Sequence, residues 1–240
     1  MRILPHALHA PLARAADALA TALFPASCLL CGGDGARPVL CPGCQADLPS
    51  LPTARCPRCA EPTTHGEHCG RCLHTPPHFD ATCALYPYEF PADRLIHALK
   101  YGHQLGLAAW FGKELAARLP AVGEALVVAL PLHPRRLSGR GFNQAGEIAR
   151  ALARQRGLEW TPDTLLRTRD TEAQAGLPLK GRAANVRGAF ECRRDLGGRP
   201  LVLVDDVMTS GATLDEAARV LKLHGAGSVM AAVVARAGRN

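Results

Sequence analysis

Two adjacent carboxylates and a turn of small hydroxyl residues stand between a buried strand and a helix near the end of the chain. The stretch LVLVDDVMTSGATL runs from residue 201 to 214 and places Asp205 and Asp206 after four branched apolar residues. The turn that follows offers backbone N–H groups and hydroxyls at a helix N-terminus, where partial positive charge attracts anions. Its residues are Thr209, Ser210, Gly211, Ala212 and Thr213. Since two carboxylates suit the vicinal hydroxyls of a sugar, the pattern predicts a site for a ribose phosphate.

The residues after this turn predict a helix over 213–224, with Thr213 as its N-cap and Glu216 completing a capping box. A buried strand over 227–235 follows the helix. A glycine-containing turn alone is common in α/β proteins, but here strand, acidic pair, turn and helix stand in one register. The stretch resembles the 5-phosphoribosyl-1-pyrophosphate (PRPP) signature of type I phosphoribosyltransferases.

Eight of the ten cysteines form four C-x-x-C pairs, and the second set of four repeats the first with a period of 28 residues. The pairs are Cys28 and Cys31, Cys41 and Cys44, Cys56 and Cys59, and Cys69 and Cys72. Two such turns supply the four thiolates of a tetrahedral zinc site, so the repeat predicts two structural Zn²⁺ ions in a double zinc ribbon. We favour sequential sites over interleaved ones, and disulfides or an iron–sulfur cluster are the alternatives.

Composition and charge limit the function classes. A chain of 240 residues with 48% hydrophobic residues can form one α/β domain and a small module, and no apolar run is long enough for a membrane span. The formal charge is +7, and all of the excess falls within residues 131–199. Because the basic residues concentrate in two loops of that segment, they predict contact with a polyanion.

The first 26 residues resemble a secretion signal only superficially. Arg14 and Asp17 interrupt the apolar stretch, and the segment that remains is at the short limit for such a signal. We therefore expect an amphipathic helix over residues 11–23 and a cytoplasmic protein.

The rest of the chain reads as an α/β domain with a parallel sheet and flanking helices. Its expected strands are 81–90, 126–130, 188–192, 201–204 and 227–235, and its expected helices are 91–102, 105–119, 142–156 and 213–224. The predicted domains are an N-terminal helix over 1–26, the double zinc ribbon over 27–78 and a phosphoribosyltransferase-like domain over 79–240. The ligand should lie at the carboxyl ends of the strands.

Three further segments belong with the acidic pair. The loop LPLHPRRLSGRGFNQ, residues 130–144, follows a strand in the manner of a pyrophosphate loop. It offers phosphate-binding charge and amides on Arg135, Arg136, Arg140, Asn143 and Gln144. The long basic segment 167–190 is typical of a mobile flap over a site. The third segment, ALKYG, contributes Lys100.

In this order, the cysteine repeat and these segments resemble the ComF family of bacterial competence proteins. The resemblance covers the chain from Cys28 to Arg236 and implies a type I phosphoribosyltransferase-like domain behind a double zinc ribbon. It also implies a cytoplasmic role in natural transformation, with single-stranded DNA as a partner, although some relatives are linked to other metabolism. A protein of the competence machinery is a further partner that the ribbon could bind.

Two function classes follow. In an active transferase, Asp205 and Asp206 would hold the ribose of PRPP, Arg140 and its neighbours would neutralise the leaving pyrophosphate, and Mg²⁺ would bridge ribose and pyrophosphate oxygens. The acceptor nucleophile is not evident from the residues. In a binding module, the same pocket would recognise PRPP or another 5-phosphoribosyl ligand without chemistry, and a positive groove would follow single-stranded DNA.

Overall fold

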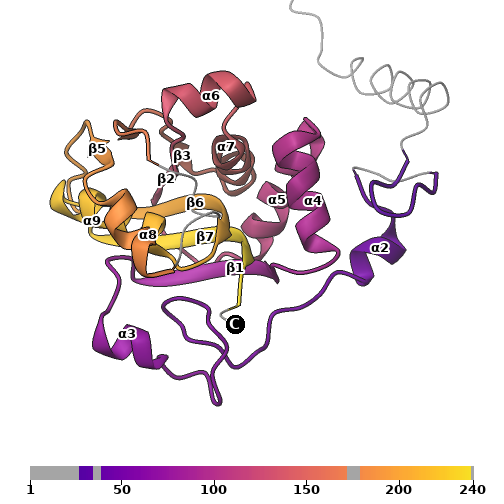
Figure 1. Ribbon diagram of the computed structural model, residues 1–240, viewed down its shortest axis with the longest axis horizontal. Helices are drawn as coiled ribbons and strands as arrows, with labels where there is room; N and C mark the ends of the chain where they lie inside the picture. Colours follow the sequence, from indigo (N-terminus) through magenta and orange to yellow (C-terminus); the bar gives the residue numbers. More distant parts are fainter. Residues whose placement is uncertain (1–26, 35–38, 172–178, 239–240) are drawn as a thin grey trace, which may run out of the picture. The chain divides into compact units, whose positions relative to one another are not determined.

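The computed structural model describes residues 27–34, 39–171 and 179–238 (Figure 1). The helix expected over 11–23 and part of the expected flap lie outside these residues. Contacts divide the chain into two compact units, Met1–Asp47 and Leu48–Asn240, so the second cysteine group belongs to the same unit as the sheet. The domain bounds 27–78 and 79–240 stay a prediction.

The two cysteine repeats have the same local structure. An isolated antiparallel bridge joins Ser27 to Asp34 in the first repeat and Arg55 to Pro62, 28 positions later, in the second. Each repeat then ends in a five-residue helix whose N-cap is a cysteine, α2 (Pro42–Ala46) after Cys41 and α3 (Gly70–His74) after Cys69. The sequence period is therefore a structural duplication.

A five-stranded sheet forms the centre of the second unit, in the order β1-β7-β6-β2-β3. All its pairs are parallel. The strands are β1 (Ala81–Pro87), β2 (Leu126–Ala129), β3 (Glu159–Trp160), β6 (Pro200–Met208) and β7 (Ser228–Arg236). The apolar runs of β2 and β6 are buried, as expected for strands covered on both faces. This confirms the predicted parallel α/β sheet with flanking helices.

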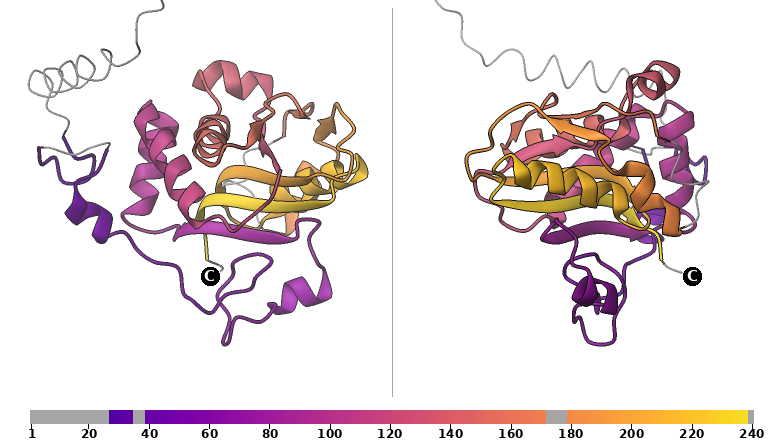
Figure 2. Two further views of the ribbon diagram at one scale, coloured as in Figure 1. Left: turned by 180° about the vertical axis from the view of Figure 1, so that it is seen from behind. Right: turned by 60° about the vertical axis from the view of Figure 1, so that its left-hand side comes forward.

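Helices cover both faces of the sheet (Figure 2). On one face α5 (Leu105–Arg118) packs against α7 (Gln144–Arg156), and α4 (Ala92–Tyr101) packs beside α5. A Cβ on Gly112 would lie 2.5 Å from the Cβ of Ala151, so α5 and α7 can approach this closely only with glycine there. On the other face α9 (Ala212–Leu223) packs on β6 and β7, with α8 (Leu179–Val186) against it.

The chain leaves β6 through α9 and leaves β2 through α6 (Pro134–Arg140) and α7. Because α9 and α7 cover opposite faces, the neighbouring strands β6 and β2 form the topological switch point of the sheet. Ligands of open α/β sheets bind at the carboxyl ends of such strands. The loops that follow β6 and β2 are therefore the ones that can build a site.

Two expectations about local structure are wrong. The strand expected over 188–192 is β5 (Phe190–Cys192), which pairs antiparallel with β4 (Leu165–Arg167) in a separate two-stranded sheet. Periodicity cannot tell which partner a three-residue apolar strand will take. The parallel sheet is completed instead by β3, which the sequence analysis did not identify.

The predicted capping box is also absent from α9. The helix begins at Ala212, and its N-cap is Gly211, with φ +80° and no side-chain cap. Glu216 instead accepts a hydrogen bond from the backbone N–H of Gly188 and pairs with Arg219. In the first turn of α9, the N–H of Ala212 donates to the hydroxyl of Ser210 at 3.3 Å, and Thr213 and Glu216 do not form the predicted capping box. In the part of the chain that the structure describes, no helix is both long and apolar enough to cross a membrane.

Candidate functional site

The acidic pair lies at the carboxyl end of β6 and is joined there by a lysine from α4. Lys100 Nζ lies 2.9 Å from Asp206 Oδ1, with both side chains mostly buried. Burial, followed by the adjacent charge of Asp206, raises the pKa of Asp205 to about 8. Burial disfavours the charged form of Lys100, but the neighbouring groups, Asp206 foremost, together outweigh this effect, and the pKa of Lys100 is raised. The structure thus brings three predicted residues together, with Lys100 paired to Asp206 and its charge also acting on Asp205.

The turn over 209–213 follows directly, and two arginines fix its carbonyl groups. Arg236 donates to the carbonyl of Thr209 at 2.6 Å, and Arg71 donates to that of Ser210 at 2.5 Å. Gly211 adopts the left-handed conformation that reverses the chain into α9. With its carbonyls bound by guanidinium groups, the turn has the form of an anion cradle at a helix N-terminus.

Basic residues of the 130–144 loop and Lys100, which pairs with Asp206, line a pocket of about 260 Å³. It is lined by Lys100, Tyr101, His103, Arg136, Gly139 and Arg140. The guanidinium of Arg140 lies 5.4 Å from the centre of the exposed ring of Tyr101. Three cations around one pocket match the charge of a polyphosphate.

The remaining predicted residues of this loop have other contacts. The Arg135 side chain is 82% exposed and lies 3.5 Å from Asp170. Asn143 donates to the carbonyl of Leu130 at 3.1 Å, and Gln144 is buried and accepts from Arg140 at 3.1 Å. Both amides therefore brace the loop, and Gln144 orients Arg140.

The sequence analysis missed Arg167, which is buried at the end of β4. Burial lowers its pKa, and the charge of the nearby Asp205 opposes that effect. Its guanidinium contacts the Phe190 ring and donates to the hydroxyl of Thr171. Thr171 also accepts from Arg136 through its carbonyl, so the start of the expected flap is docked on the basic loop. A buried arginine in a flap-like sequence gives no signal of its own.

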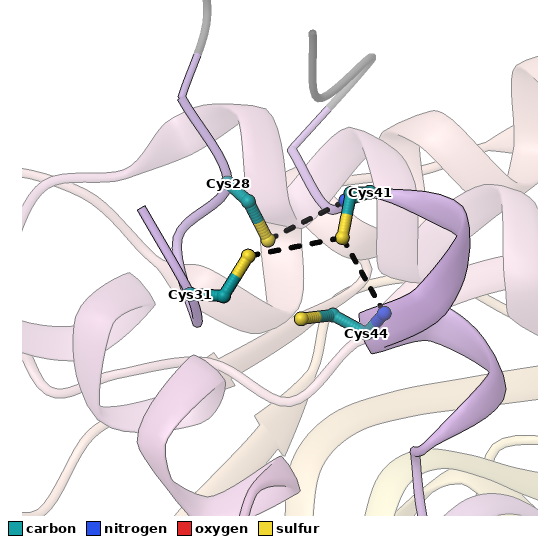
Figure 3. A group of neighbouring side chains, drawn as sticks. All are labelled: Cys28, Cys31, Cys41 and Cys44. Carbon is teal, nitrogen blue, oxygen red and sulfur yellow. Dashed lines mark hydrogen bonds between the residues drawn. The ribbon is translucent and has the colours of Figure 1, made fainter. Parts of the chain in front are cut away.

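The eight repeat cysteines form two separate clusters of four. In each cluster all four sulfur atoms lie within 4.8 Å of one another. Figure 3 shows Cys28 and Cys31 on one turn and Cys41 and Cys44 on another, with the sulfur atoms converging between them. The second cluster contains Cys56, Cys59, Cys69 and Cys72. This confirms the sequential grouping of the ligands.

The donor chemistry of both clusters fits Zn²⁺. Burial opposes ionisation of Cys28, but backbone N–H donors, those of Cys31 and Cys41 foremost, lower its pKa to about 6. Hydrogen bonding to Cys41, followed by burial, raises the pKa of Cys44 to about 12. Without a cation, four such neighbouring thiols cannot all ionise. A divalent ion with tetrahedral preference removes that conflict, and four thiolates leave it no open catalytic position.

Comparisons with known proteins agree with this architecture. A family model described as a double zinc ribbon domain matches residues 19–73, and one described as a phosphoribosyl transferase domain matches residues 140–240. The DNA utilization protein YhgH of Escherichia coli (strain K12) is 35% identical over 72% of this chain and 80% of its own. Competence protein F of Haemophilus influenzae is 31% identical over 88% of this chain and 96% of its own. The solved glutamine PRPP amidotransferase from B. subtilis is 22% identical over 52% of this chain and 25% of that one, with a TM-score of 0.36.

Fold and cysteine sites together define a phosphoribosyltransferase-fold protein that carries a double zinc ribbon. The chain belongs to the ComF family of competence proteins.

Metal analysis tests the two-site arrangement. We expect two zinc ions per chain when the protein is purified under reducing conditions, and one ion after Cys41→Ser or Cys69→Ser, because three thiolates hold zinc poorly. Elemental analysis by mass spectrometry measures the ratio. Two ions in wild type but none in Cys41→Ser would show that the clusters do not bind independently.

Thermal unfolding tests the raised pKa of Asp205. An unfolded aspartate ionises near pH 4, whereas folded Asp205 keeps its proton until about pH 8. Between these values the folded chain binds the extra proton, so this group lowers stability as pH rises. Asp205→Asn keeps the acceptor for the Asp206 N–H and removes that loss. We expect the Tm of Asp205→Asn to rise relative to that of wild type from pH 5 to pH 8. The gain should be ~2–4 °C for each kcal/mol of unfolding free energy that wild type loses over this range. A pH-independent difference would contradict the raised pKa.

Proposed function

We propose that this ComF-family protein binds PRPP or another 5-phosphoribosyl ligand at the carboxyl ends of β6 and β2, and handles single-stranded DNA in the cytoplasm during natural transformation. The observation that carries the proposal is the arrangement of carboxylates, phosphate turn and cationic pocket around one switch point. Asp206 and Asp205 lie on β6, the 209–213 turn follows them, and Lys100 links the pair to the pocket.

Each part of the proposed ligand has matching groups. The first turn of α9 and the 209–213 backbone offer N–H donors to the 5-phosphate. The carboxyl groups of Asp205 and Asp206 suit the two ribose hydroxyls, which are hydrogen-bond donors. Arg136 and Arg140 line the pocket in which a pyrophosphate or a DNA phosphate would lie.

The same pocket has features suited to single-stranded DNA. Tyr101 is 59% exposed and stands beside Arg140, and His103 lies 5.8 Å from Phe142 between ring centres. Exposed aromatic rings next to cations are the usual means of binding unstacked bases with little sequence preference. Tyr86, by contrast, is buried against Trp110 and serves the core. The names of the relatives, which refer to DNA utilization and competence, agree with this proposal.

An active phosphoribosyltransferase is the second candidate, and the pKa of Asp205 favours it. A carboxyl group that titrates near pH 8 can exchange a proton close to neutrality. An acceptor would form a bond to the anomeric carbon as the bond to pyrophosphate breaks, and the acceptor proton would pass to the ionised form of Asp205, which is populated as the pH approaches 8. Mg²⁺ bound with the ligand beside Asp205 and Asp206 would supply charge neutralisation. Release of pyrophosphate from PRPP in the presence of a base panel distinguishes this candidate from a binding module.

Calorimetric titration tests the ligand site. We expect PRPP with Mg²⁺ to bind wild type, and we expect Asp206→Asn to weaken this binding roughly tenfold or more. The amide lacks the negative charge that pairs with Lys100, and it is a weaker acceptor than a carboxylate for the ribose hydroxyls. The control is Asp163→Asn, an exposed aspartate in the loop before β4. Equal affinities in wild type and Asp206→Asn would place the ligand elsewhere.

Salt dependence tests the DNA surface. Replacing Arg135, Arg136 and Arg140 by Ala should weaken single-strand binding and reduce the slope of log K against log salt by up to about 2, at ~0.7 per lost phosphate contact. Fluorescence anisotropy with a labelled oligonucleotide measures both quantities. Arg150, Arg154 and Arg193, three exposed arginines elsewhere in the 131–199 segment, form the matched control triple. If the two triples change the slope equally, the surface lies outside the pocket.

A further inference from the structure

The second zinc ribbon contacts the phosphate turn, and it does so through an arginine held between two zinc ligands. Arg71 lies between Cys69 and Cys72 in α3. Its Nη1 donates to the carbonyl of Ser210, a residue 139 positions away in the sequence. A Cβ built on Gly211 would lie 3.8 Å from Nη2 of the same arginine. The guanidinium thus lies directly against the turn that precedes α9.

No carboxylate among the described residues forms an ion pair with Arg71. Its Nε and Nη2 are buried and have no hydrogen-bond partner among the described residues, and its one acceptor is a neutral carbonyl. Buried cations are costly unless an anion or several acceptors compensate them. An anionic ligand bound at the 209–213 turn would supply the negative charge that this guanidinium lacks.

The duplication supplies an internal comparison. The 28-residue period places Gly43 of the first ribbon at the position of Arg71, and Gly33 at the position of Glu61. Glu61 pairs with Arg236, which also holds the carbonyl of Thr209. The second ribbon therefore differs from the first at two positions that reach the 209–213 turn, directly or through Arg236.

A third contact fixes the end of the same ribbon to the helix of the site. The backbone N–H of His78 donates to Asp215 Oδ1 of α9 at 2.7 Å, and the imidazole Nδ1 lies 2.8 Å from the same oxygen. The ribbon is thereby held at both the turn and the helix that would bind a phosphate.

We propose that Arg71 is part of the phosphate site: held by the second zinc, it supplies positive charge to the 5-phosphate of the ligand, so that the second ribbon sets the affinity for phosphoribosyl groups. This rests on the proposed function of the 205–213 segment. The zinc ligands Cys69 and Cys72 hold α3 in place, and α3 positions Arg71. Arg71 in turn binds the Ser210 carbonyl and places its positive charge next to the 209–213 turn.

Titration with ribose 5-phosphate and with PRPP and Mg²⁺ tests this coupling on the full chain. Arg71→Met should raise the Kd of both ligands roughly tenfold or more while the protein keeps two zinc ions. Arg71→Lys should restore part of the affinity, because it keeps the charge and loses the planar fork. Cys69→Ser should lose one zinc and weaken both ligands as Arg71→Met does. The matched control is Arg58→Met, since Arg58 lies between Cys56 and Cys59 of the same ribbon and donates to the carbonyl of Pro77.

A ³¹P resonance experiment separates charge at the phosphate from general support of the fold. The second pKa of a phosphate monoester is near 6, and a neighbouring cation lowers it. The titration of bound ribose 5-phosphate should therefore shift to higher pH in Arg71→Met and remain unchanged in Arg58→Met. If wild type binds and Arg71→Met has the same Kd and the same ³¹P titration, the role of Arg71 is wrong. If wild type binds neither ligand, the proposed function itself fails.

Discussion

A buried guanidinium joins three parts of the Leu48–Asn240 unit. Arg236, at the end of β7, is 2% exposed and donates to the carbonyls of Cys59, Met208 and Thr209 and to the carboxylate of Glu61. A buried charge must be surrounded by acceptors, and these acceptors come from the second ribbon and from the turn after β6. Sheet, ribbon and turn are therefore held by one side chain, and removing it would take a hydrogen-bond donor from acceptors in all three.

The position of the site follows from the topology of the sheet. The chain turns to opposite faces after β6 and β2, so the loops that follow these strands meet at their carboxyl ends. One loop contains the 209–213 turn, and the other contains Arg136 and Arg140. Lys100 comes from α4, pairs with Asp206 and lines the same pocket as Arg136 and Arg140, so it connects the two loops. The raised pKa of Asp205 is the cost of placing two carboxyl groups in this buried position.

The sequence was sufficient for features that a local pattern determines. The C-x-x-C repeat predicted both cysteine clusters, and the run before Asp205 and Asp206 predicted β6 and the turn after it. Contacts between segments that are distant in the sequence could not be predicted from it. Arg71, Arg167 and Arg236 are ordinary arginines in the sequence, and only folding shows that each is placed against a carbonyl, a ring or a carboxylate. The substitution of Arg71 for Gly43 in the repeat was the one available signal. The pairing of β5 with β4 was likewise set by tertiary contacts and not by its three residues.

The central claim is that the second ribbon and the phosphate turn respond to one ligand as a single site. Hydrogen exchange of the full wild-type chain, measured by mass spectrometry with and without PRPP and Mg²⁺, tests it most directly. The account predicts slower exchange in peptides covering both 205–213 and 69–75, because the ligand would neutralise Arg71 and fix the Ser210 carbonyl that it binds. Protection of 205–213 with no change in 69–75 would contradict the coupling, and no protection of 205–213 would contradict the site.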